Sequence, residues 1–197
     1  MTDLAGGGAT ARALQIDYAF IEYLEGGLVL SGYVPVSGKS QSGVTIGCGV
    51  DLGQRDEAEL RRWGSAPDLI DQLRPYLGLQ KEAAEAALEL APLEVTEETA
   101  RFLSIAARQS ITQSLGLFYE RDSGGCLSEL PPAAQTVIAS VAYQYGAGLR
   151  SECPAFWRTA CRQHWGAMEA ELRDFKDSYA SRRIQEADYL KAGLAAR

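Results

Sequence analysis

Two carboxylates near the start of the chain lie in unusually bare surroundings. Glu25 is followed at once by two glycines, and Asp51 belongs to the glycine-rich segment 43–53, GVTIGCGVDLG, together with the polar Thr45. No Asp or Glu lies between the two acids. A carboxyl half-sheltered by apolar groups has a raised pKa, as a general acid needs, so Glu25 is the first candidate for proton-transfer chemistry.

Glu22, one helical turn upstream, is the rival to Glu25. On a helix with about 100° per residue, Glu25 lies at the edge of the apolar face and Glu22 points away from it. That face is formed by Leu14, Tyr18, Ile21 and Leu24. The wheel and the adjoining glycines favour Glu25 as the acid and make Glu22 a solvated carboxylate. For Asp51 the plainer interpretation is a turn aspartate in a glycine-rich hairpin.

Composition excludes several other chemistries. The chain of 197 residues has one histidine, His164, so a metal site built on several histidines is impossible. Its formal net charge of −7 argues against general nucleic-acid binding, which needs a basic surface. Gly47-x-Gly49 continues to Gly53 as GxGxxxG with no alternating strand and helix units after it, so we reject a dinucleotide site.

The elements that position these residues follow from the hydrophobic pattern. Residues 1–13 are expected to form a flexible leader, and 14–25 a helix that the glycines end. Two β-like runs over 28–36 and 42–50 predict a small irregular hairpin. Helical spacing then recurs over 56–64, 66–78, 80–91, 96–115, 131–146, 154–164 and 167–175. The fold class is therefore α+β, mainly α.

The four cysteines contain no CxxC pair, so a zinc ribbon or thioredoxin-like site is not expected. Their positions are Cys48, Cys126, Cys153 and Cys161. A helix beginning at Pro154 would hold Cys153 and Cys161 too far apart for a bridge. A disulfide from Cys126 to either of them and four reduced thiols both remain open.

Several motifs together resemble one known family. They are YLEGG (23–27), GYVP (32–35), SGVTIGCGVDLGQR (42–55), AAQTVIASVAYQYG (133–146), PAFWR (154–158) and YASRRIQEADYL (179–190). In this order they look like the pesticin-like muramidase domain, a branch of the phage-type lysozyme superfamily. The resemblance runs from about Ile16 to Gly193. It implies a lysozyme-like domain over 14–197, in which a small N-terminal lobe with the helix and β element (14–58) and a larger helical lobe (59–197) flank a cleft.

The resemblance assigns roles position by position. It implies that Glu25 protonates the glycosidic oxygen, that Thr45 helps hold the water or the substrate, and that Asp51 is the second carboxylate, which orients a water. Ordinary phage enzymes place that aspartate before the TIG motif, where this chain has none. One protonated and one ionised carboxyl are what glycosidic cleavage requires. The stereochemical outcome depends on their separation.

The helical lobe supplies further candidates for substrate binding. The resemblance places Gln144 on the cleft, and Tyr179, Arg182, Arg183 and Glu186 along its saccharide or peptide-stem side. The plainer alternatives are a polar residue at a helix end for Gln144 and a solvated, charged helix for the others.

The function implied is a muramidase that hydrolyses the β-1,4 bond between N-acetylmuramic acid and N-acetylglucosamine in peptidoglycan, with neither metal nor organic cofactor. The alternatives are a lytic transglycosylase or chitinase-like enzyme, and a non-catalytic peptidoglycan-binding module. We expect a monomer that binds no nucleic acid and has no membrane span. Because no signal peptide is recognisable, we expect synthesis in the cytoplasm and delivery to the periplasm or cell wall by other machinery, as a toxin, effector or lysin with a cognate immunity protein.

Overall fold

The computed structural model describes residues 12–35 and 42–196, and these form two compact units. The sheet unit consists of Ala19–Ser110, and the helical unit of the described residues on either side of it, 12–18 and 111–196. The expected leader over 1–13 falls mostly outside the described residues. The change of unit falls after Ser110, because α2, α3 and α4 share one core with the strands, and the lobe boundary expected at residue 58 stays a prediction.

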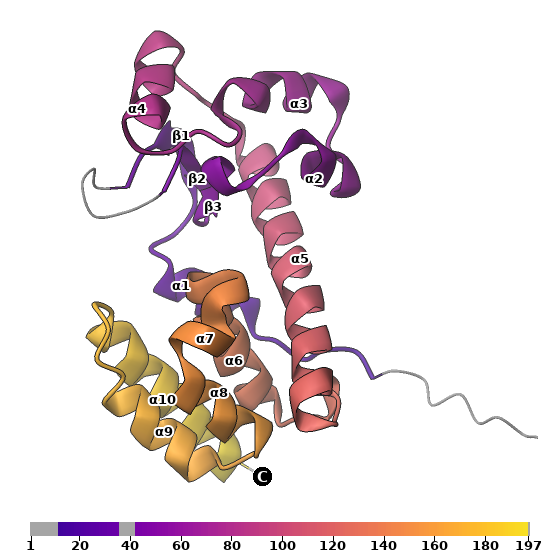
Figure 1. Cartoon of the computed structure of the whole chain (residues 1–197), viewed down its shortest axis with the longest axis vertical. Helices are drawn as coiled ribbons and strands as arrows, with labels where there is room; N and C mark the ends of the chain where they lie inside the picture. Colours follow the sequence, from indigo (N-terminus) through magenta and orange to yellow (C-terminus); the bar gives the residue numbers. More distant parts are fainter. Residues whose placement is uncertain (1–11, 36–41, 197) are drawn as a thin grey trace, which may run out of the picture. The chain divides into compact units, whose positions relative to one another are not determined.

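The sheet unit begins within α1 (Tyr18–Leu24), at its second residue, and α1 leads into a three-stranded antiparallel sheet of order β1-β2-β3. The strands are β1 (Val29–Tyr33), β2 (Thr45–Gly47) and β3 (Val50–Asp51). A 3-10 turn (Leu52–Gln54) follows, and then α2 (Glu57–Arg62), α3 (Pro67–Leu73) with a 3-10 turn at Arg74–Tyr76, α4 (Lys81–Leu90), and the long α5 (Glu97–Ser123), which continues into the helical unit (Figure 1).

The core of the sheet unit joins the strands to these helices. Its fully buried apolar side chains come from both the β element and the helices that follow it, and they include Val44, Ile46, Leu52, Leu60, Ile70, Leu73, Ala84 and Leu103. The free edge of β1 is covered by the segment after α4, because Gly32 donates to the carbonyl of Leu93 at 2.8 Å and Val95 donates to that of Leu30 at 3.0 Å. The outer edge of β1 is thus fixed by main-chain hydrogen bonds to the segment between α4 and α5.

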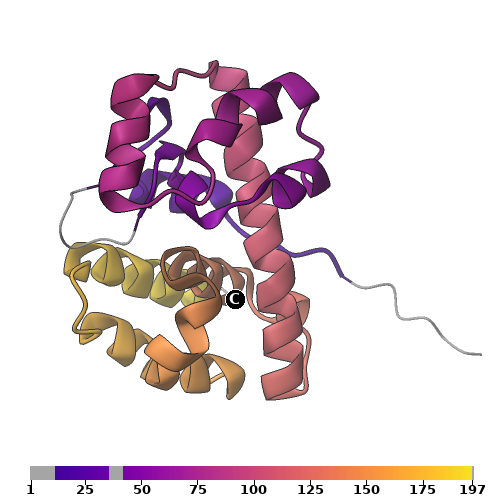
Figure 2. The ribbon, with the colours of Figure 1, turned by 45° about the horizontal axis from the view of Figure 1, so that its top comes forward.

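The helical unit is built around α6 (Pro132–Tyr145), in which ten successive residues, 133–142, are buried. The remaining helices are α7 (Leu149–Glu152), α8 (Pro154–Cys161), α9 (Trp165–Arg173) and α10 (Ala180–Ala195), with 3-10 turns at Leu127–Glu129 and Gly146–Gly148. Helix α10 packs against both α6 and α9 (Figure 2). Because buried residues lie on every side of α6, this helix occupies the centre of the helical unit.

The mainly helical α+β fold class is confirmed, and several helix boundaries differ from expectation, most of all those of α1 and α5. The first helix was predicted from Leu14 but begins at Tyr18, because the preceding backbone is bound to α6: Gln15 N–H donates to Gln135 Oε1 at 2.7 Å and Asp17 N–H to Thr136 Oγ1 at 2.9 Å. The helix predicted over 96–115 continues to Ser123. All four cysteines are free, which leaves the four-thiol alternative. In the part of the chain that the structure describes, no helix is both long and apolar enough to cross a membrane.

Candidate active site

The sheet brings two of the predicted site residues directly opposite each other. Thr45 of β2 pairs with Asp51 of β3, and on its other side Thr45 pairs with Tyr33 of β1. Residues directly opposite in antiparallel strands point to the same face, with Cβ atoms about 5 Å apart. Tyr33, Thr45 and Asp51 therefore form one row across the sheet. Thr45 is 4% exposed and its hydroxyl donates to the carbonyl of Gly43 at 3.3 Å.

The carboxylate of Asp51 is held by backbone amides. Its Oδ1 accepts from the N–H of Gly43 at 3.0 Å and from the N–H of Gly53 at 2.8 Å. Asp51 is also the N-cap of the 3-10 turn that follows β3, in an extended conformation (φ −81°, ψ 106°). The carboxylate is thus fixed by main-chain groups on both sides rather than by a mobile side chain.

This amide cradle requires glycine at both positions because three backbone segments meet there. A Cβ on Gly53 would lie 2.4 Å from the carbonyl oxygen of Leu79 and 2.8 Å from the Cα of Gly43, and a Cβ on Gly43 would lie 2.2 Å from the same oxygen. The structure therefore explains why the motif has glycine at positions 43 and 53, where a side chain would clash with the backbone. These glycines let two amides reach one carboxylate.

Burial raises the pKa of Asp51. The N–H groups of Gly43 and Gly53 and the nearby charge of Arg55 act in the opposite direction, since each favours the ionised carboxylate, but they do not cancel the effect of burial. Asp51 was expected to be an ionised carboxylate among glycine amides. The amides are present, and the proton is held more tightly than in an ordinary aspartate.

Glu25 is fixed by an arginine that sequence reasoning missed. Its backbone N–H still donates to the carbonyl of Ile21 at 3.1 Å, so the residue continues the geometry of α1 by one position. Its Oε2 accepts from the guanidinium of Arg108 on α5 at 3.3 Å, with side chains 15% and 9% exposed. The arginine favours the carboxylate form of Glu25. The protonated acid expected at this position stays a prediction.

Glu22 shares the same arginine. Its Oε2 lies 3.5 Å from Arg108, and its Oε1 lies 3.8 Å from Arg101, one to two turns earlier on α5. The Glu22 side chain is 35% exposed, more than twice the value for Glu25. Burial of Arg108 disfavours its charge, yet the charges of Glu25, Cys48 and Glu22 outweigh that effect and raise its pKa. The more sheltered carboxyl is Glu25, as the helical wheel predicted.

Tyr33 links Glu25 to the row on the sheet. Burial raises the pKa of the Tyr33 hydroxyl, and the negative charge of Glu25 raises it further, which places the two side chains in one electrostatic environment. Tyr33 belongs to the GYVP motif, so the sequence carried a signal for it. Arg108 had no such signal, because 83 residues separate it from Glu25.

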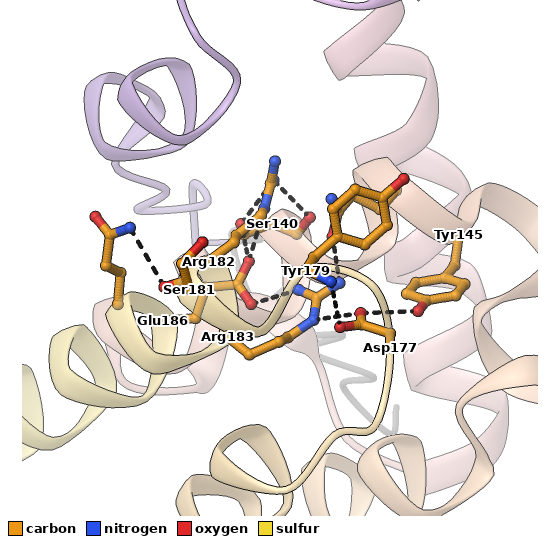
Figure 3. Close-up of polar contacts among 10 residues, drawn as sticks. Ser140, Tyr145, Asp177, Tyr179, Ser181, Arg182, Arg183 and Glu186 are labelled. Carbon is orange, nitrogen blue, oxygen red and sulfur yellow. Dashed lines mark hydrogen bonds and ion pairs between the residues drawn. The ribbon is translucent and has the colours of Figure 1, made fainter. Parts of the chain in front are cut away.

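The other predicted site residues belong to the helical unit, where three of them, Arg182, Arg183 and Glu186, are buried. Arg183 is 1% exposed and donates from Nε to Asp177 Oδ2 at 2.9 Å, and also to Glu186 and to the side-chain oxygen of Gln144. Arg182 is 8% exposed and donates from Nε to Glu186 Oε1 at 3.1 Å. Figure 3 shows both guanidiniums directed into this network.

The network extends to α6 and to the segment before α10. Arg182 also donates to the carbonyl and hydroxyl oxygens of Ser140 at 3.2 and 3.1 Å. Asp177 accepts from the hydroxyl of Tyr145 at 3.0 Å and from the N–H of Tyr179 at 2.9 Å (Figure 3). The alternative of a solvated, charged helix is therefore wrong for the two arginines. Tyr179, 51% exposed, is the member of the predicted binding set that solvent reaches most.

No group of three or more His, Cys, Asp or Glu side chains among the described residues could hold a metal ion. What the sheet unit offers instead is acid–base chemistry. It holds two carboxylates in different environments, Glu25 beside a guanidinium and Asp51 on backbone amides. Tyr33 and Thr45, which carry hydroxyl groups, lie in one row across the sheet with Asp51. Such pairs of carboxylates divide the acid and base roles between them.

A mainly helical domain with a small antiparallel sheet and this pair of carboxylates belongs to the lysozyme-like class of folds. A family model, Pesticin, described as a bacterial toxin homologue of phage lysozyme, C-term, matches residues 15–166. The chain belongs to this family. At the level of the family, this supports a lysozyme-type toxin with glycosidase activity. No curated protein matches the chain.

Proposed function

We propose that this protein is a muramidase that hydrolyses the β-1,4 bond between N-acetylmuramic acid and N-acetylglucosamine in peptidoglycan. The observation that carries the proposal is the opposition of Thr45 and Asp51 on the sheet, with the Asp51 carboxylate bound by the amides of Gly43 and Gly53. A carboxylate fixed in this way can orient a water molecule with little loss of entropy at the moment of reaction. The lysozyme-type family supports the same reaction class.

In this proposal Glu25 is the general acid and Asp51 the carboxylate that orients the attacking water. Glu25 gives its proton to the glycosidic oxygen as the bond to the anomeric carbon breaks. The water then loses a proton toward Asp51 as its oxygen bonds to that carbon. Thr45 assists by holding the water or the substrate. Arg108 keeps the Glu25 side chain in place and, with Glu25 ionised after the reaction, stabilises the product state.

Digestion of purified peptidoglycan, with mass spectrometry of the products, tests this assignment. We expect muropeptides with reducing N-acetylmuramic acid ends from the wild type and none from Glu25→Gln or Asp51→Asn. Glu22→Gln is the matched control, because it removes the neighbouring carboxylate that contacts the same arginine. We expect it to keep activity within several-fold. Full activity of Glu25→Gln would refute the proposal, and loss in Glu22→Gln alone would transfer the role of acid to Glu22.

The same digest separates the rival functions. A lytic transglycosylase leaves 1,6-anhydro ends and has no need of Asp51, so anhydro products from both wild type and Asp51→Asn would favour it. Cleavage of chitin oligomers at a rate comparable with that of peptidoglycan would favour a chitinase-like enzyme. A non-catalytic module would pellet with peptidoglycan and release nothing.

We propose further that the protein is an antibacterial toxin, effector or lysin made in the cytoplasm and acting on the wall from the periplasm after export by other machinery. The description of its family as a bacterial toxin homologue of phage lysozyme supports this role. We expect loss of viability when the chain is directed to the periplasm, and none when it stays in the cytoplasm or carries Glu25→Gln. A cognate immunity protein would bind tightly and restore growth, and light scattering after gel filtration would report a monomer.

A further inference from the structure

The helical unit contains a surface pocket that the proposed reaction does not use. It has a volume of about 400 Å³ and is lined by side chains at the end of α5 and along α8. The lining residues are Asp122, Ser123, Trp157, Arg158, Cys161 and Arg162. A volume of this size is within the range of sites for small molecules.

The carboxylate and the hydroxyl group that line the pocket, those of Asp122 and Ser123, already form hydrogen bonds within the protein. Asp122 accepts from Arg150 Nε at 2.5 Å, from Arg121 Nε at 3.1 Å and from the indole N–H of Trp157 at 2.9 Å. The indole N–H, and with it the two guanidiniums, outweigh burial and lower the pKa of Asp122, so it is a carboxylate at neutral pH. The Ser123 hydroxyl donates to the carbonyl of Tyr119 at 2.7 Å.

Cys161 does not act as a nucleophile in this pocket. Burial, and secondly the negative charge of Asp122, raise the pKa of its thiol to about 11. Only the thiolate is reactive, and it is scarce at neutral pH. The pocket is therefore better suited to binding than to covalent chemistry.

Arg158 and Arg162 are the groups in the pocket without a counter-charge. Both are exposed, and within residues 12–35 and 42–196 neither forms an ion pair or a side-chain hydrogen bond. Four residues apart, they lie on one face of the helical segment and repel each other. With Arg121 and Arg150 engaged by Asp122, the surroundings of the pocket carry four guanidiniums and one carboxylate.

We infer that this pocket binds a single phosphate group, held between the guanidiniums of Arg158 and Arg162. The planar donor fork of arginine matches the oxygens of phosphate, and two forks on one helix face can converge on one such group. The phosphate source is either a free small molecule or a phosphate carried by a polymer. This inference does not rest on glycoside hydrolysis.

Calorimetric titration of the full chain at constant ionic strength tests the inference, with inorganic phosphate, glycerol 1-phosphate and a glycerol-phosphate polymer as probes and chloride as the blank. We expect saturable binding of one phosphate per chain. In a parallel titration by NMR, the indole N–H signal of Trp157 should shift while that of Trp63, outside the pocket, stays in place. Equal affinity for free and polymeric phosphate would indicate that the natural ligand is a small molecule. An affinity at least tenfold higher for the polymer would indicate that the natural ligand is a phosphate carried by a polymer.

The double variant Arg158→Gln/Arg162→Gln should weaken binding at least tenfold and leave peptidoglycan cleavage unchanged. Arg12→Gln/Arg62→Gln removes two other exposed arginines and is the matched control for net charge. The inference is wrong if no probe binds saturably, if the pocket variant binds as the wild type does, or if the control variant loses the same affinity. Because cleavage is measured on the same variants, failure of this inference and failure of the proposed function are distinguishable.

Discussion

Substitution of Gly53 by Ala tests whether the position of Asp51 depends on the close approach of three backbone segments. The new Cβ would lie 2.4 Å from the carbonyl oxygen of Leu79, where ordinary contacts begin at 3.4 Å, so the segments must separate by about 1 Å. A displacement of that size lengthens the 2.8 Å bond from the Gly53 amide to Asp51 beyond hydrogen-bonding distance.

The expected cost has two parts. Overpacking of this kind costs about 1–3 kcal/mol, and the loss of a hydrogen bond to a charged group costs about 1.5–3 kcal/mol. We therefore expect Gly53→Ala to lower the free energy of unfolding by about 2.5–6 kcal/mol. Because Asp51 loses one of its two amide donors and moves, kcat on peptidoglycan should fall at least tenfold.

Gly49→Ala is the matched control in the same β element. Gly49 has φ +75° and nothing lies within 4 Å of a Cβ added there, so alanine brings backbone strain without a clash. That strain costs about 1–2 kcal/mol and leaves the Asp51 cradle intact. Urea unfolding gives the stabilities, and dye release from labelled peptidoglycan gives the rates. Equal stability and equal rates for the two variants would refute the reasoning, and Gly43→Ala, facing the same oxygen, should behave as Gly53→Ala does.

Three further substitutions test other parts of the structure. Asp51→Asn should be inactive yet more stable than the wild type at pH 7, because burial raises the Asp51 pKa and the Asn side-chain oxygen still accepts from both N–H groups. In urea titrations across pH this gain in stability should disappear below about pH 3.9, where the aspartate of the unfolded wild type is protonated too. Glu186→Gln should lower the free energy of unfolding, measured by calorimetry, by about 3–5 kcal/mol, because the buried guanidiniums of Arg182 and Arg183 lose their shared carboxylate. Glu97→Gln, the control in an exposed ion pair, should lower it by under about 0.5 kcal/mol. Arg108→Gln should lower kcat at least tenfold with little change in KM, because it frees the Glu25 side chain; a higher KM at unchanged kcat would contradict a positioning role.

The local parts of the site could be predicted from the sequence because their causes are local. Seven residues contain Thr45, the turn at 48–49 and the partner strand with Asp51, so register follows from a short hairpin. Of the two glycines of the amide cradle, Gly53 lies two residues after Asp51, and Gly43 lies two residues before Thr45, the residue paired with Asp51. The alternation of polar and apolar residues then sets which side chains share a face.

The parts that could not be predicted depend on contacts between distant residues. The first helix starts late because α6 binds the backbone of Gln15 and Asp17, about 120 positions away. The spacing of charged residues around Arg183 fits a solvent-exposed helix as well as it fits a buried one. Its burial follows from Asp177 and from Gln144 on α6, which the helical periodicity of α10 does not report. Propensity and periodicity describe an element, whereas these features depend on its neighbours.

The two acids are held by different means, and this difference bears on their roles. Asp51 is bound by main-chain amides within the β element, so its position is as fixed as the strands themselves. Glu25 is bound through a side-chain contact, 3.3 Å from a guanidinium that it shares with Glu22. A group that must transfer a proton to a substrate oxygen gains from a bond that a ligand can exchange. A group that must orient water gains from rigidity. The electrostatics alone do not assign the roles, but the way each side chain is held agrees with the proposed ones, Glu25 as acid and Asp51 as the water-orienting carboxylate.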